Sequence, residues 1–193
     1  MARNETRRRE LADAGLRVLA RDGARGLTHR AVDGEAGTPV GTASNYFRSR
    51  DALVRGLVER IYERLTPDPE VHAELAARTP SRALFADYVR DIVTRLTAER
   101  DTTIALFELR LEAARRPEVA EVMTAFQRES FAGDVAFYLA AGLPGGAFEV
   151  ALFHYAIDGL LLDRLTTSID PDTSTDAVVD ALVEGLLPGG STA

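Results

Sequence analysis

The chain contains no cysteine, no tryptophan and no lysine, so all 23 of its basic residues are arginines. Without cysteine there is no disulfide, no thiol nucleophile and no thiolate metal ligand. Without lysine there is no Schiff-base chemistry. The three histidines, His29, His72 and His154, are too scattered for metal-ligand spacing. We therefore predict neither a metal site nor a cofactor.

Long hydrophobic runs are also missing. The most apolar segment, residues 150–162, is shorter than a membrane-spanning helix and is interrupted by His154 and Asp158. No apolar N-terminal run indicates a secretory signal. P-loop, Rossmann and nucleophile-elbow motifs are absent, and the glycines of residues 142–146 indicate a turn. We expect a soluble cytoplasmic protein that is not an enzyme.

Charge is distributed unevenly along the chain, whose net charge is −7. Up to Arg64 there are 13 arginines against 9 acidic residues, whereas the remainder holds 10 arginines against 21 acidic residues. This asymmetry is expected when one end of a protein meets phosphate, and chance clustering on a solvated surface is the alternative.

Residues 28–51 have the pattern of two short helices and a tight turn, followed by a third helix. Apolar residues at helical spacing predict the first helix over residues 29–36, capped by Thr28. A threonine followed by a proline predicts the second helix over residues 39–47. The third helix begins near Asp51, after two arginines that form a natural phosphate clamp. This is the pattern of a helix-turn-helix, although capped short helices also occur on ordinary helical bundles.

The outward face of the second helix is mostly small or hydrogen-bonding, and few of its residues could anchor a core. Its members are Val40, Gly41, Thr42, Ser44, Asn45 and Tyr46. A helix that lies in a DNA major groove needs such groups. Beneath it we predict a small core made of Leu27, Val32, Phe47, Leu53, Val54 and Leu57. Phe47 is thus a core residue and not a DNA contact.

Several short motifs lie at fixed spacing through this region: Gly26-Leu27-Thr28, Ala36-Gly37, Gly41-Thr42, Tyr46-Phe47 and Ser49-Arg50-Asp51-Ala52-Leu53. They resemble the DNA-binding domain of the tetracycline-repressor (TetR) family of transcription regulators. The match covers roughly the first third of the chain and is specific because it is long. The remainder is similar to the family in length and helical layout.

The resemblance implies that Arg30 and the six outward positions of the second helix face the major groove. Arg30 is our candidate for a guanine contact, because its guanidinium matches O6 and N7. Arg50 would bind phosphate. Two positions depart from the family: Ser44 replaces a tyrosine that contacts phosphate, and Gly34 destabilises the first helix by roughly 1 kcal/mol relative to alanine. Tyr46 is available to replace the lost aromatic contact.

Helical patterns account for the chain, so we predict an all-α, TetR-like fold of about nine helices. Residues 1–50 form a basic arm and the helix-turn-helix domain, residues 51–66 a linking helix, and residues 67–193 a ligand-binding and dimerisation domain. The arm, residues 2–9, reaches DNA or is a solubilising tail. The helices expected in the C-terminal part cover residues 81–100, 101–115, 117–141, 146–168 and 174–187.

The helix over residues 146–168 is apolar on nearly every side and must be buried on every side. Residues 174–187 have a similar apolar surplus. Two such helices from each of two subunits would form a four-helix interface, which is how the TetR family dimerises and reads a palindromic operator. A central helix in a monomeric bundle is the alternative.

Side chains of four C-terminal helices are candidates for a ligand pocket: Phe85, Tyr88, Ile92, Phe107, Arg110, Leu111, Met123, Phe126, His154 and Asp158. If these faces converge, they form a mostly apolar cavity with a few polar groups, as small-molecule sites do. The alternative is that they are the bundle core, with His154 and Asp158 hydrogen-bonded to each other.

The leading hypothesis is a homodimeric, ligand-responsive transcription regulator, in the first instance a repressor. A small apolar ligand would favour a dimer geometry in which the two recognition helices no longer match successive major grooves of the double-stranded operator. No membrane partner is expected. The alternatives are a helical-bundle small-molecule-binding protein or enzyme without DNA binding, and a DNA-binding domain with a ligandless C-terminal half.

Overall fold

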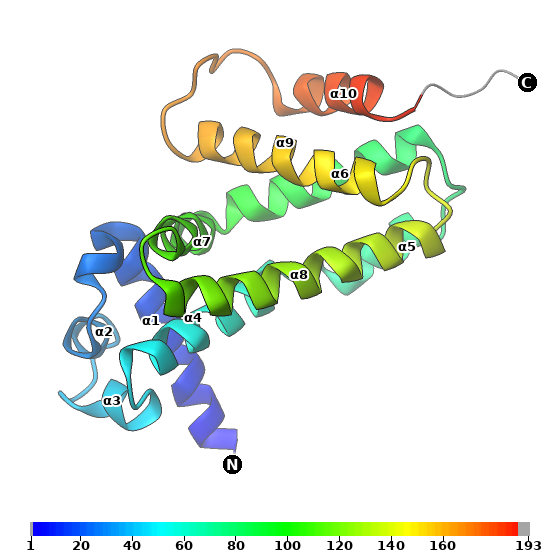
Figure 1. Ribbon diagram of the computed structural model, residues 1–193. Helices are drawn as coiled ribbons and strands as arrows, with labels where there is room; N and C mark the ends of the chain where they lie inside the picture. The colour runs from blue at the N-terminus through cyan, green and yellow to red at the C-terminus, as the bar shows by residue number, and fades with distance from the viewer. Residues whose placement is uncertain (1, 189–193) are drawn as a thin grey trace, which may run out of the picture. The chain divides into compact units, whose positions relative to one another are not determined.

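The computed structural model describes residues 2–188, which form ten α-helices and no β-strand (Figure 1). The predicted all-α fold is confirmed. The helices are α1 (Ala2–Gly26), α2 (His29–Glu35), α3 (Thr42–Tyr46), α4 (Arg50–Leu65), α5 (Pro69–Ala76), α6 (Arg82–Ala98), α7 (Arg100–Ala113), α8 (Pro117–Ala140), α9 (Ala147–Leu165) and α10 (Thr175–Leu186).

The helices group into two compact units. Unit 1 contains the chain up to Thr66 together with Glu99–Gln127, and unit 2 contains Pro67–Ala98 together with the chain from Arg128. The division falls within α8 and assigns α7 to unit 1, whereas the sequence pattern places everything after residue 66 in one domain. The difference arises because Ala105 and Leu109 of α7 are buried in the same hydrophobic cluster as residues of α1 and α4.

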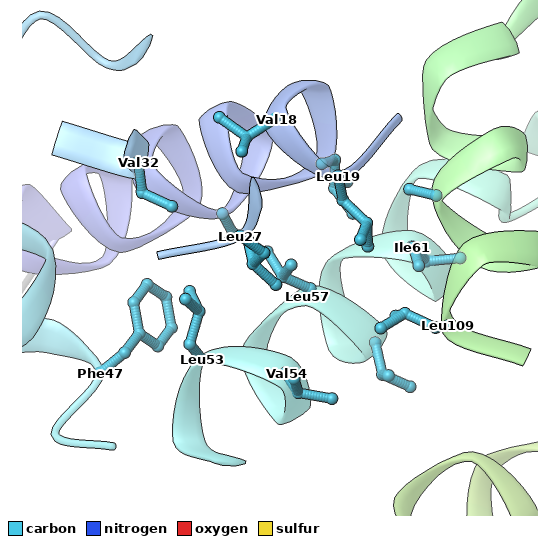
Figure 2. Close-up of a cluster of buried hydrophobic side chains, with 14 of the residues drawn as sticks. Val18, Leu19, Leu27, Val32, Phe47, Leu53, Val54, Leu57, Ile61 and Leu109 are labelled. Atoms are coloured by element: carbon cyan, nitrogen blue, oxygen red, sulfur yellow. The ribbon is translucent and has the colours of Figure 1, made fainter. Parts of the chain in front are cut away.

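The core of unit 1 is the small cluster predicted beneath the helix-turn-helix, extended by α7 and the start of α8. All six predicted core residues are buried: Leu27, Val32, Phe47, Leu53, Val54 and Leu57. Figure 2 shows their side chains converging, with Leu109 of α7 in the same cluster. Phe47 is 1% exposed, which confirms it as a core residue.

The basic residues at the start of the chain are the first turns of α1, which begins at Ala2, and not an extended arm or tail. Arg8 pairs with Glu59 of α4 at 2.9 Å, and its guanidinium carbon lies 5.1 Å from the centre of the Phe47 ring. These contacts with residues far along the chain hold the start of α1 against α4. The polar sequence of residues 2–9 gives no indication of them. The side chain of Arg3 lies outside the described residues.

An ion-pair network joins α1, α4 and the start of α7 within unit 1. Arg60 donates two hydrogen bonds to Asp13, at 2.8 and 3.0 Å. Arg64 donates to Asp13 at 3.1 Å and to Glu99 at 2.8 Å. Burial raises the pKa of Asp13, but the two guanidinium groups outweigh burial and lower the pKa below its usual value. Asp13 is therefore charged at neutral pH, and α4 is fixed by charge as well as by packing.

Unit 2 contains a short helix that the sequence pattern did not predict. The carboxylate of Asp68 caps α5 by accepting hydrogen bonds from the backbone N–H groups of Glu70 at 2.8 Å and Val71 at 3.4 Å. Pro69 occupies the first turn of this helix, where a missing N–H costs nothing. In the same unit α6, α9 and α10 pack on one another (Figure 1). Among the described residues, no helix is both long enough and apolar enough to cross a bilayer.

Candidate nucleic-acid interface

Both helices of the predicted motif are present, but the second is shorter than expected. Thr28 caps α2, because its hydroxyl accepts a hydrogen bond from the N–H of Ala31 at 3.1 Å. The second helix, α3, begins at Thr42 and not at Pro39. Gly41 has φ 95°, a backbone conformation that suits glycine, so residues 39–41 belong to the turn and the helix follows them.

A buried carboxylate from α2 holds the start of α3. Asp33 is 1% exposed, and its two oxygens accept hydrogen bonds from the N–H groups of Ala43 at 2.6 Å and Gly41 at 2.7 Å. The hydroxyl of Thr38 donates to the same carboxylate at 3.3 Å. Sequence reasoning missed this residue because its partners follow it by eight and ten positions, beyond the range of a local cap. One signal in the sequence was available: Asp33 is adjacent to Val32, which the helical pattern places in the core, so its carboxylate could have been expected near the core as well.

Two further side chains tie the motif to backbone carbonyls. His29 Nε2 lies 2.6 Å from the carbonyl oxygen of Phe47. Arg50 donates to the carbonyl of Leu27 at 2.6 Å and to that of Ala24 at 2.7 Å. These bonds engage both terminal nitrogens of the guanidinium that was expected to bind phosphate. Arg50 thus holds the junction between α1 and α2.

The outer surface of α3 and its preceding turn carries the residues predicted to read DNA. Val40, Ser44 and Asn45 are exposed, and Gly41, Thr42 and Tyr46 are half-buried. The hydroxyl of Thr42 donates to the carbonyl of Pro39 at 2.6 Å, and that of Ser44 to the carbonyl of Gly41 at 2.9 Å. Ala43 alone among residues 42–46 is fully buried. The helix therefore contacts the core through Ala43 and, in part, Tyr46, and leaves Ser44 and Asn45 accessible.

Exposed arginines surround the motif, and they differ in whether they have acidic partners. Arg17 and Arg21 of α1 pair with Glu35 at 2.8 and 2.7 Å, which fastens α2 to α1. Hydrogen bonds from Arg21 and Arg17 lower the pKa of Glu35. Within the described part of the chain, four exposed arginines of this region have no acidic partner: Arg25, Arg30, Arg48 and Arg55. Their guanidinium groups are available to phosphate.

An open depression of about 450 Å³ lies where the first turns of α1 meet the end of α3. It is lined by Asn4, Glu5, Arg8, Asn45 and Tyr46. The start of α1 thus borders the outer surface of α3. Asn4 adds a polar side chain beside Asn45 that sequence reasoning did not single out.

The C-terminal part of the sequence identifies the family. Residues 80–189, more than half of the chain, match the family described as "Tetracyclin repressor-like, C-terminal domain". The chain belongs to the TetR family. The resemblance of its N-terminal motifs is thereby confirmed, and the TetR-family protein is a ligand-responsive, DNA-binding transcriptional regulator.

Solved TetR-like structures superpose on nearly all of this TetR-family protein. The multidrug binding protein EbrR, solved with imidazole, is 26% identical, with a TM-score of 0.66 over 96% of this chain and 97% of its own. EbrR solved with proflavin is 28% identical, with a TM-score of 0.57 over 92% and 98% of the two chains. A TetR-family member from Streptomyces coelicolor A3 is 26% identical, with a TM-score of 0.68 over 94% and 98%. No protein with a curated function matches in sequence.

The candidate pocket residues of this TetR-family regulator fall into both units. Unit 1 holds Phe107, Arg110, Leu111, Met123 and Phe126, and unit 2 holds Phe85, Tyr88, Ile92, His154 and Asp158. In unit 1, Met123 is buried in the core and Phe126 stacks on Tyr62 with ring centres 5.2 Å apart. In unit 2, His154 Nε2 lies 3.1 Å from a carboxylate oxygen of Asp134.

Aromatic side chains of α5, α6, α8 and α9 form two groups of three in unit 2. His72, Tyr88 and Phe137 contact one another, with ring centres 5.0 to 5.9 Å apart. Phe85 contacts Tyr138 and Phe153, with ring centres 5.3 and 4.4 Å apart. The hydroxyl of Tyr88 is buried without a hydrogen-bond partner, and burial raises the pKa of this tyrosine. An unsatisfied hydroxyl among aromatic rings is a polar group that a bound ligand could satisfy.

Proposed function

We propose that this regulator reads its operator through the outer surface of α3. The residues assigned to the major groove are Arg30, Val40, Gly41, Thr42, Ser44, Asn45 and Tyr46. The proposal depends on one observation: Ala43 and Asp33 fix this helix from beneath, while its small, hydrogen-bonding side chains stay accessible. A helix with that combination fits a groove whose base edges present donors, acceptors and methyl groups.

Phosphate contact is assigned first to Arg48, which is exposed and directly precedes the N-cap Ser49 of α4. Free N–H groups at a helix N-terminus attract phosphate, and a neighbouring guanidinium adds a charged donor. Arg50, by contrast, has its terminal nitrogens on the carbonyls of Leu27 and Ala24. Arg30 remains our candidate for a guanine contact.

The partner proposed for α9 is a second copy of the chain. Its outward residues form one apolar stripe at helical spacing: Phe148, Leu152, Tyr155, Gly159 and Leu162. Phe148 is 69% exposed and Tyr155 71%, whereas Phe153 and Ile157 on the opposite face are buried in unit 2. Such a stripe supports a homodimer through residues 146–168 and 174–187, which would present two copies of α3 to a palindromic operator.

The proposed ligand is a small, largely apolar molecule that binds against the aromatic rings around Tyr88 in unit 2. Tyr88 offers it a hydroxyl donor, and EbrR was solved with proflavin, a planar aromatic molecule. A ligand of this kind releases a repressor by binding more tightly to the dimer geometry that does not fit DNA. Couplings of this sort are typically ~1 to 3 kcal/mol.

The test is a titration of the purified protein with DNA from its own upstream region, or selected from random sequence, at several salt concentrations. Arg30→Ala should relax specificity toward any sequence. Arg48→Ala should weaken binding to all sequences and reduce the salt slope by about one phosphate contact. Arg50→Ala should lower thermal stability and leave that slope unchanged, because its partners are carbonyls.

Wild-type protein that binds no duplex DNA at low salt would exclude the proposed reading surface. The chain would then fit the alternative of a helical bundle that binds small molecules without DNA.

A further inference from the structure

The recognition helix has no cap of its own. α3 covers five residues, and its N-cap position is Gly41, which has no side chain to accept a hydrogen bond from the first turn. A helix this short is unstable in isolation, because nucleation costs more than its few hydrogen bonds return. Its first N–H groups also need partners where they are buried. Some other group must therefore fix where α3 begins and which way it points.

Asp33, on the neighbouring helix α2, fixes both the starting point and the direction of α3. Its carboxylate accepts hydrogen bonds from the N–H groups of Gly41 and Ala43, one on each oxygen, and it is almost entirely removed from solvent. Hydrogen bonds to a carboxylate are short and roughly twice as strong as those between neutral groups. Two bonds to alternate residues fix both the position and the rotation of the first turn, which carries Thr42 and, one turn on, Asn45.

We propose that Asp33 is a positioning residue for operator recognition: its buried carboxylate sets the register in which α3 presents side chains to bases. This inference depends on the proposed role of α3 as the reading helix. It has a chemical corollary. Asp33 occupies the positive N-terminal end of α3, so this end is not available to a DNA phosphate. Phosphate binding then depends on exposed arginines such as Arg48.

The experiment compares Asp33→Ala and Asp33→Asn with wild type and with a matched control, Asp68→Ala. Asp68 is also a carboxylate that accepts two backbone N–H groups at a helix start, but it caps α5 in unit 2. For each protein one measures affinity for the selected operator, affinity for random duplex DNA, the salt slope, and the exchange protection of the Gly41 and Ala43 amides.

Asp33→Ala should weaken operator binding by about 10- to 100-fold, the loss expected for hydrogen bonds to a charged group. Binding to random DNA and the salt slope should change little, because the phosphate-binding arginines are untouched. Asp33→Asn retains one acceptor oxygen and should give an intermediate loss. Asp33→Ala should lose amide protection at both Gly41 and Ala43, and Asp33→Asn at one of the two, while the rest of unit 1 stays protected.

The inference alone would be overturned by a folded Asp33→Asn variant with wild-type operator specificity, or by equal losses of affinity for operator and random DNA. A loss of specificity in Asp68→Ala as large as in Asp33→Ala would also overturn it, because any lost cap would then have the same effect. Failure of the wild type to bind duplex DNA is a different outcome, and it removes the reading surface itself.

Discussion

Tyr88 carries a hydroxyl group in surroundings that give it no hydrogen bond. Its ring is enclosed by His72 and Phe137, whose ring centres lie 5.9 and 5.3 Å from its own. An unsatisfied buried hydroxyl destabilises a fold relative to an apolar group of the same shape. If Tyr88 binds the proposed ligand through this hydroxyl, stability and ligand recognition oppose each other at this residue.

Tyr88→Phe should therefore stabilise the ligand-free protein by roughly 1 kcal/mol, because it removes the unsatisfied oxygen and keeps the ring. Urea unfolding measures this as a higher midpoint at unchanged m value. Phe85→Leu is the control, because it removes aromatic packing without involving a polar atom and should destabilise. A destabilised Tyr88→Phe would show that the hydroxyl has a partner in solution.

At the scale of single elements, α2 contains a glycine that no contact requires. A Cβ added to Gly34 meets nothing within 4 Å, and the same is true of Gly37, which follows the helix. The two differ in backbone conformation, because Gly37 has φ 62° and Gly34 lies within the regular helix. They form a matched pair in which packing is constant and conformation varies.

Gly34→Ala should stabilise the protein by roughly 0.5 to 1 kcal/mol, since alanine loses less conformational entropy in a helix. Gly37→Ala should destabilise it by about 1 kcal/mol or more, because the left-handed conformation strains a residue with a Cβ. Thermal unfolding of both variants measures the signs. Equal shifts in the same direction would contradict the conformational explanation.

Local signals in the sequence were sufficient for α2 and insufficient for α3. The cap of α2 and its C-terminal glycine are within one turn of the helix they bound, so spacing reveals them. The start of α3 is set by Gly41 in a left-handed conformation and by Asp33, eight and ten residues before its partners. Neither can be read from the Thr-Pro pair that predicted a start at Pro39.

The same distinction applies to the pocket and to the helices around it. Phe85 and Tyr88 share one face of α6, and the sequence pattern singled out both. His72, Phe137 and Phe153 join them from three other helices, and no local periodicity shows which faces meet. α5 lies at the start of the predicted C-terminal domain and was not expected as a helix, although Pro69 occupies its first turn and Asp68 caps it.

At the scale of the whole molecule, the apolar stripe of α9 is the surface that the proposed dimer would bury. The helix was predicted to be buried on every side, and in the single chain one side is open, with Phe148, Tyr155 and Leu162 at 69%, 71% and 50% exposure. Large contiguous apolar surfaces of this kind are typical of interfaces. A DNA reader that engages two half-sites needs such a partner.

Tyr155→Glu should convert the proposed dimer to monomer, because a charge placed in the centre of an apolar interface costs roughly 2 kcal/mol or more. Sedimentation equilibrium gives the dissociation constant. Val71→Glu, at an exposed apolar residue of α5, is the matched control and should leave assembly unchanged. A wild-type chain that sediments as a monomer at micromolar concentration would contradict the proposed interface.

The residues that hold α3 in place are different from the residues that it exposes to solvent. Ala43, Phe47 and Asp33 form the support, whereas Val40, Ser44 and Asn45 are exposed and lie outside the core of unit 1. Surface substitutions of that kind usually change stability by less than about 0.5 kcal/mol. If α3 reads the operator as proposed, substitutions at these positions can change the preferred DNA sequence with little effect on the stability of the fold.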